Sequence, residues 1–286
     1  MTELQNSKKD ISEESDYLIE VAKKIILISH NQEGIQTDGR GMRAMKIFTR
    51  QTLSTISLLK LLPSVNKTDE IWDITSFASI TRNIIECFIN LYYFGTEKVS
   101  ESEAELRFFL LQYHKNNEWF NIRKKSLSPI EYKEFDDGLR FEKERLKNHP
   151  FLEHLELEEK NRTLKGYEIY KSKSFFEKEL IVCNSLREHY RLLSNLVHPL
   201  PLSVERTNNI NGRGMDSEAD LNYFLICIML SRKYLAATLI EIRNKFNDTL
   251  GKQFKNDFDN IEKFITKGFE KKLRLTSSLV KERSKG

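Results

Sequence analysis

The segment SLREHYRLLSNLVHP carries side chains that could together act on a phosphate group. Arg187, Arg191, Ser194 and His198 recur at spacings of four, three and four residues, which places them on one helical face, and Tyr190 adjoins them. An imidazole can transfer protons near neutral pH, and a guanidinium can hold a phosphate through two parallel hydrogen bonds. Arg191 and His198 are therefore candidate catalytic residues, and the other three are candidate supporting residues. In the alternative interpretation, His198 only caps its helix and Arg191 pairs with an acid on a neighbouring element.

A second polar stripe lies on the otherwise apolar segment TSFASITRNIIECFINLYYF. Arg82 and Glu86 are four residues apart on a predicted helix, so their side chains can pair directly. Burying such charges is costly unless they are paired, so one interpretation is that this pair lines a pocket or a dimer seam and supports the site. The alternative is an ion pair on a solvated strip or within the bundle. The helical period aligns the pair with Ser79, Asn90 and Tyr93.

Both stripes require long helices, and apolar periodicity predicts helices along most of the chain. Residues 174–198 are predicted to form one continuous helix, because Pro199 and Pro201 force an extended exit after it. No segment shows sustained alternation of apolar and polar residues, so we predict an all-α protein that folds as a multi-helix bundle. The other predicted helices cover residues 16–30, 42–62, 71–94, 101–120, 217–246 and 252–273.

The distribution of charge predicts three regions. Residues 1–15 are polar and are predicted to form a disordered N-terminus. Residues 16–250 are predicted to form the helical bundle, with a charged, proline-interrupted insert at about 121–173. Residues 252–286 contain ten Lys or Arg and five Asp or Glu, so their local charge is +5 while the rest of the chain is at −1. They are predicted to form a basic amphipathic helix followed by a tail. This last region could bind nucleic acid or pack on the bundle through its phenylalanines.

Composition excludes several classes of protein. The chain has 286 residues with a formal net charge of +4, which alone does not identify a nucleic-acid binder. Cys87, Cys183 and Cys227 are widely spaced in apolar segments, so we expect reduced thiols in a cytoplasmic protein. The N-terminus has no apolar stretch resembling a signal sequence, and no membrane insertion is expected. The sequence has no metal-site, phosphate-loop or serine-hydrolase motif, so neither a metal nor another cofactor is expected.

The order of these motifs resembles an uncharacterised bacterial family of helical proteins that is classed as a domain of unknown function. The resemblance covers about residues 40–245 and rests on an R-x3-E helix and a helix with Y-x3-S-x3-H-P. A more distant likeness is to the HEPN superfamily, whose helical bundles often dimerise and often act as metal-independent ribonucleases with an R-x4-6-H motif. Arg191 and His198 fit that spacing, although Leu192 stands where the superfamily motif commonly has a polar residue.

The HEPN likeness implies an endoribonuclease with an HEPN-like core, acting on RNA in a defence or toxin-type system. His198 would act as general base or acid on the 2′-hydroxyl, and Arg191 would stabilise charge on the phosphate. RNA and a second copy of the chain, in a homodimer, are the implied partners. The competing hypothesis is a non-catalytic helical interaction or adaptor protein, in which Arg191 and His198 matter only for stability.

Overall fold

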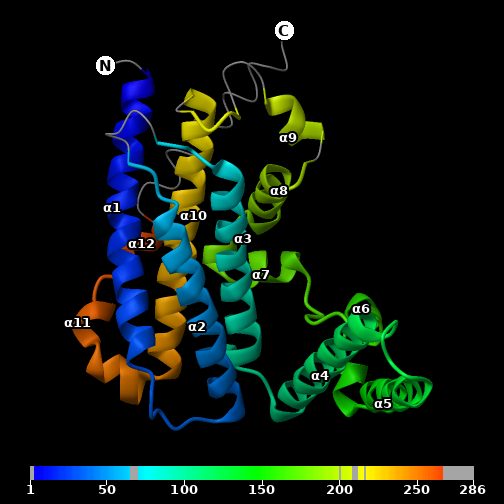
Figure 1. Cartoon of the computed structure of the whole chain (residues 1–286). Helices are drawn as coiled ribbons and strands as arrows, with labels where there is room; N and C mark the ends of the chain where they lie inside the picture. Colours follow the sequence, from blue (N-terminus) through cyan, green and yellow to red (C-terminus); the bar gives the residue numbers. More distant parts are fainter. Residues whose placement is uncertain (1–2, 65–69, 200, 208–211, 216, 267–286) are drawn as a thin grey trace. The chain divides into compact units, whose positions relative to one another are not determined.

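The computed structural model describes residues 3–64, 70–199, 201–207, 212–215 and 217–266 (Figure 1). Helices are the only regular elements within these ranges, which confirms the predicted all-α class. The chain divides into two compact units. The first unit combines Met1–Thr96 with Ile181–Gly286, and the second is Glu97–Leu180.

A helical bundle forms the first unit. The long helices α1 (Glu3–His30) and α10 (Glu218–Lys245) pack along one another, and α2 (Gly39–Lys60) packs on both α1 and α3 (Ile74–Leu91). α10 also packs on α3, so the four helices share one core. The shorter helix α8 (Leu186–Val197) packs on α3 (Figure 1). α3 is therefore in contact with α2, α8 and α10, as its mostly apolar sequence indicates.

Helix α10 is the central helix of this bundle. Ser217 caps its N-terminus by accepting a hydrogen bond from the backbone N–H of Asp220. By length and apolarity α10 could cross a membrane, but 83% of its most apolar window is buried inside the protein. Burial among other helices is the environment of a core helix.

The N-terminal helix corrects the prediction that residues 1–15 are disordered. α1 begins at Glu3, and both Ile11 and Glu14 are buried. Glu14 forms an ion pair with the fully buried Arg232 of α10, with 3.3 Å between Oε2 and Nε. The first half of α1 is therefore helical despite its polar composition, and its contacts include the buried Ile11 and the ion pair of Glu14 with Arg232. Apolar periodicity alone does not detect such a segment.

The C-terminal part of the first unit is less regular than the predicted helix over residues 252–273. Asn260 has a left-handed backbone, with φ of 59°, and it separates two one-turn helices. The chain bends there, and Phe258, Ile261 and Phe264 on either side of the bend are all buried. Residues 267–286, and with them the predicted basic tail, lie outside the described residues. The minor elements of the unit are η1 (Tyr92–Thr96), η3 (Ile181–Cys183), α9 (Pro201–Arg206), η4 (Asn247–Gly251), α11 (Lys255–Phe258) and α12 (Lys263–Thr266).

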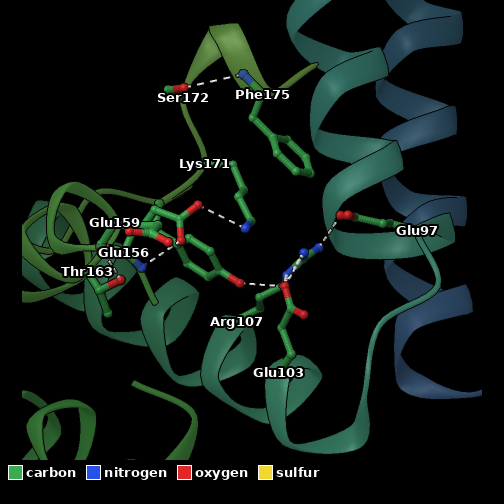
Figure 2. A network of polar contacts seen from close by, with 10 residues as sticks. Glu97, Glu103, Arg107, Glu156, Glu159, Thr163, Lys171, Ser172 and Phe175 are labelled. Atoms are coloured by element: carbon green, nitrogen blue, oxygen red, sulfur yellow. Dashed lines mark hydrogen bonds and ion pairs between the residues drawn. The ribbon is translucent and has the colours of Figure 1, made fainter. Parts of the chain in front are cut away.

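The second unit contains the predicted charged insert but is larger than the predicted range of 121–173. It begins with α4 (Glu101–Arg123), which packs on α5 (Pro129–Lys147). Two further helices, α6 (Leu157–Leu164) and α7 (Lys173–Glu179), and the short η2 (Pro150–His154) complete it. The interior of this unit includes a polar network: Arg107 is 3% exposed and donates to Glu97 and Glu103 (Figure 2).

The predicted continuous helix over residues 174–198 is broken. α7 ends at Glu179, Leu180 is extended, and Ser185 has a left-handed backbone with φ of 61° immediately before α8. The break coincides with the boundary between the two units at Leu180 and Ile181. Apolar periodicity continues across this boundary because the residues on each side of it are buried within their own unit. The sequence pattern therefore does not reveal that the chain passes from the second unit to the first.

Candidate functional site

Four polar side chains from the two predicted stripes meet between α3 and α8. We call Arg82, Glu86, Tyr190 and His198 the α3–α8 cluster. Arg82 Nε lies 3.2 Å from Glu86 Oε1, and Arg82 Nη1 lies 3.4 Å from His198 Nε2. Arg82 Nη2 also donates to the Tyr190 hydroxyl, which in turn donates to Glu86. The predicted pairing of Arg82 with Glu86 is confirmed, and the same guanidinium joins the second stripe to the first.

The position of His198 follows from the residue after it. The backbone before a proline is driven out of the helical region, and His198 is extended, with φ of −91° and ψ of 143°. Its N–H still donates to Ser194 O, so His198 is the C-cap of α8, and its carbonyl accepts a hydrogen bond from Ser203 Oγ at 2.6 Å. His198 therefore leaves the helical periodicity of α8, and its ring meets Arg82 of α3.

The cluster is partly exposed to solvent. The Arg82 side chain is 25% exposed and the Glu86 side chain is 44% exposed, while the guanidinium carbon lies 4.3 Å from the centroid of the Tyr190 ring. Burial raises the pKa of Tyr190, Glu86 raises it further, and Arg82 opposes the shift. Tyr190 therefore remains a hydrogen-bond donor at neutral pH. His198 is exposed, so its ring is accessible to a ligand.

The remaining predicted site residues of α8 lie outside this cluster: the candidate catalytic residue Arg191 and the candidate supporting residues Arg187 and Ser194. Arg187 and Arg191 are exposed on α8, and the hydroxyl of Ser194 donates to the carbonyl of Tyr190 at 2.8 Å. The guanidinium found next to His198 is thus that of Arg82 instead of that of Arg191. On α3, Ser79 is exposed but Tyr93 is fully buried, because it lies in the π-helix η1 that follows α3.

Buried polar residues of α10 were not selected from the sequence. Ser231, Arg232 and Lys233 are consecutive, and each is 5% exposed or less. Consecutive residues point in three directions on a helix, and Ser231 donates to Thr81 of α3 at 3.1 Å while Arg232 pairs with Glu14 of α1. The sequence signal was available, since SRK interrupts the apolar run ICIMLSRKYLAATLI. Two adjacent basic residues, Arg232 and Lys233, inside such an apolar run indicate that polar contacts exist within the core.

Lys233 should make the stability of the protein depend on pH. Burial lowers its pKa from 10.5 to about 8, and Cys183 opposes this shift. Between pH 8 and pH 10.5 the unfolded state binds more protons than the folded state, so the free energy of unfolding rises with pH. We expect a rise of about 2 kcal/mol from this group between pH 7 and pH 9.5. Lys233→Met should remove that rise and stabilise the protein at pH 7, as measured by urea unfolding.

The exposed Lys23 of α1 provides the control for this comparison. Lys23→Met should keep the pH dependence of the wild type. A Lys233→Met variant with the same pH dependence as the wild type would show that the ammonium group is not disfavoured by burial.

The cysteines are free and buried, as predicted. Burial raises the pKa of Cys87 to about 11 and that of Cys227 to about 12, so both remain neutral thiols at physiological pH. Within the described part of the chain, no group of three or more His, Cys, Asp or Glu side chains is arranged to hold a metal ion.

Fold and site together define an all-helical protein with a solvent-accessible histidine and arginine between two packed helices. No family model matches the sequence, and no curated protein and no solved structure shows significant similarity to it. The geometry of the α3–α8 cluster is therefore the basis for a functional proposal.

Proposed function

We propose that this protein is a metal-independent endoribonuclease and that RNA binds over the α3–α8 cluster. The observation that supports the proposal is the placement of an exposed imidazole beside a guanidinium, with 3.4 Å between His198 Nε2 and Arg82 Nη1. An imidazole supplies proton transfer and a guanidinium supplies stabilisation of a charged phosphate, which are the two functions that cleavage of RNA by its own 2′-hydroxyl requires.

In this reaction the 2′-oxygen attacks the adjacent phosphorus and the bond to the 5′-oxygen breaks. His198 takes the proton of the 2′-hydroxyl, or as imidazolium gives a proton to the leaving 5′-oxygen. The products are a 2′,3′-cyclic phosphate and a 5′-hydroxyl. One imidazole serves one of these two transfers. The other proton transfer is assigned to water or to the His198 imidazole of a second copy, in the homodimer that the HEPN resemblance implies.

Arg82 and Arg191 share the task of stabilising the phosphate in this proposal. Arg82 is held in one orientation by Glu86 and by the face of the Tyr190 ring. In this proposal its remaining N–H groups donate to the phosphate. Arg191 is exposed on the same helix as Tyr190 and is free to contact the phosphate or the next one along the strand. Arg82 thus replaces Arg191 as the expected nearest cation to the scissile phosphate. Defence or toxin-type action on cellular RNA is the biological role that this activity would serve.

The test is cleavage of an unstructured RNA by the purified full-length protein in the presence of EDTA. The wild type should generate ends with a 2′,3′-cyclic phosphate, and His198→Ala should reduce the rate by about 10²- to 10⁴-fold. Arg82→Ala should reduce it by about 10²- to 10³-fold, the effect of removing one donor to a charged transition state. Circular dichroism and thermal unfolding verify that each variant is folded.

His30→Ala is the matched control, because His30 is also an exposed histidine at the C-terminal end of a helix. It should cleave RNA at the rate of the wild type. Absence of cleavage by the wild type, or equal rates for His198→Ala and His30→Ala, would overturn the ribonuclease proposal.

A second candidate function is a non-catalytic interaction module, and one observation favours it. The second unit exposes large apolar side chains on α4 and α5, which is a feature of protein-binding surfaces. The same cleavage experiment separates the two candidates. An interaction module predicts no cleavage by any variant, with Arg82→Ala affecting only stability. The most exposed of these side chains are Phe108, Trp119, Ile122, Ile130 and Phe141.

A further inference from the structure

Helix α2 differs from every other described helix of eight or more residues, because it has no acidic side chain. Arg40, Arg43, Lys46, Arg50 and Lys60 give it five positive charges in 22 residues, in a chain whose formal net charge is +4. This basic helix is separate from the basic C-terminal segment, residues 252–286. Such a concentration of positive charge indicates an anionic partner for α2.

Burial divides these five side chains into two groups. Arg40 donates to Phe94 O at 3.4 Å, and Arg43 lies 5.6 Å from the centroid of the Phe94 ring, so both are directed toward the bundle. Lys46, Arg50 and Lys60 are exposed and form no ion pair with any residue that the structure describes. These three unpaired cations define the basic stripe of α2.

The basic stripe lies on the outer face of the helix. Its members share spacings of three and four residues with the exposed residues Met42, Leu53 and Ser57. The Ser57 hydroxyl is a further group of the kind that contacts phosphates. The stripe therefore presents positive charge along the length of α2, from Lys46 to Lys60.

The stripe is linked across α3 to the α3–α8 cluster. Arg50 acts electrostatically on the thiol of Cys87 on α3, where it opposes the rise in the pKa of that thiol, and the thiol donates to Asn83 Oδ1 at 3.3 Å. Asn83 is the neighbour of Arg82, whose guanidinium contacts His198. α2 and α8 both pack on α3, and neighbouring helix axes lie about 8–10 Å apart. An RNA strand whose scissile phosphate lies at His198, and which runs across α3, would therefore have its neighbouring phosphates on the side of α2.

We propose that the basic stripe of α2, formed by Lys46, Arg50 and Lys60, binds the phosphates of a single RNA strand that flank the scissile bond. This inference rests on the proposed ribonuclease function for the identity of the nucleic acid. An RNA backbone is favoured as the occupant because the charges of the stripe are unpaired and repeat along a line, as phosphates do.

The test measures binding of a 2′-O-methyl oligouridine about 20 nucleotides long, which cannot be cleaved, to the full-length protein. The variant K46Q/R50Q/K60Q removes three phosphate contacts. Near 0.1 M salt we expect the affinity to fall by about 10- to 100-fold, and the slope of log K against log salt to decrease by about 2. The double variant K46Q/K60Q leaves the Arg50 contact with α3 intact and should give about two thirds of the change in slope.

The matched control is K124Q/K125Q/K133Q, which removes three exposed lysines from the second unit. An equal loss of affinity in this control, or wild-type binding by the α2 variant, would overturn the proposal. So would binding of the wild type to phosphatidylserine vesicles but not to the RNA. Because the oligonucleotide is not cleaved, loss of binding in the α2 variant supports the stripe even if His198→Ala shows that the catalytic proposal is wrong.

Discussion

Replacing Glu14 by alanine should lower the free energy of unfolding by about 3–5 kcal/mol. The substitution leaves the guanidinium of Arg232, which is fully buried in the core, without its carboxylate. Breaking a buried ion pair by removing one partner costs this much because an uncompensated charge remains in a medium of low dielectric constant. Burial already lowers the pKa of Arg232, and Glu14 opposes that shift. In a Trp119→Phe background, urea unfolding followed by the fluorescence of Trp72, which lies in the same unit, measures the loss.

The adjacent residue supplies the control. Glu13 pairs only at the surface with Lys9, at 3.9 Å, and both side chains are more than half exposed. Glu13→Ala should change stability by less than about 0.5 kcal/mol. The double variant Glu14→Leu with Arg232→Met should recover most of the loss, because it replaces the pair by apolar groups of similar size. Equal effects of Glu13→Ala and Glu14→Ala would contradict the placement of α1 against α10.

Replacing Arg107 by alanine should destabilise the second unit by about 3–5 kcal/mol. Arg107 Nη1 lies 2.6 Å from Glu97 Oε2, and Nη2 lies 2.5 Å from Glu103 Oε1. Figure 2 shows Arg107 between Glu97 and Glu103. Tyr170 also donates to Glu103 at 2.5 Å, so three side chains are linked to one guanidinium. Without it, two carboxylates that are 12% and 15% exposed would face each other with no cation between them.

Each unit has its own tryptophan, which makes this loss measurable in the intact chain. Trp119 lies in the second unit and Trp72 in the first, and the sequence has only these two. In a Trp72→Phe background, urea unfolding of Arg107→Ala followed by Trp119 should shift to lower urea. Arg140→Ala removes an exposed arginine that pairs with Asp136 in the same unit, and it should shift the transition by less than about 0.5 kcal/mol. A similar shift for both arginine variants would show that the buried network does not hold the unit together.

Local patterns predicted the elements that contain the candidate site. The apolar runs identified the helices that became α3 and α10, and the spacing of four identified the Arg82 and Glu86 pair. Pro199 correctly predicted the extended exit at His198. These features depend on interactions within a few residues, so the sequence around each position is sufficient to predict them.

Contacts between distant segments were not predictable in the same way. The fully buried Arg232 has its carboxylate on α1, more than 200 positions earlier in the chain, in a segment whose polarity predicted disorder. The break at Ser185 was missed because apolar residues continue on both sides of the boundary while their packing partners change. Spacing along one helix grouped His198 with Arg191, whereas the guanidinium that contacts His198 is that of Arg82 on α3.

The sequence by itself therefore determined an all-α protein and the two helices that carry the candidate site. Only the tertiary structure decided that Arg82 meets His198 and that Tyr190 and Glu86 orient that arginine. The physical reason is that helical periodicity specifies which side chains share a face of one helix. Which two faces meet depends on how the buried surfaces of all the helices fit together.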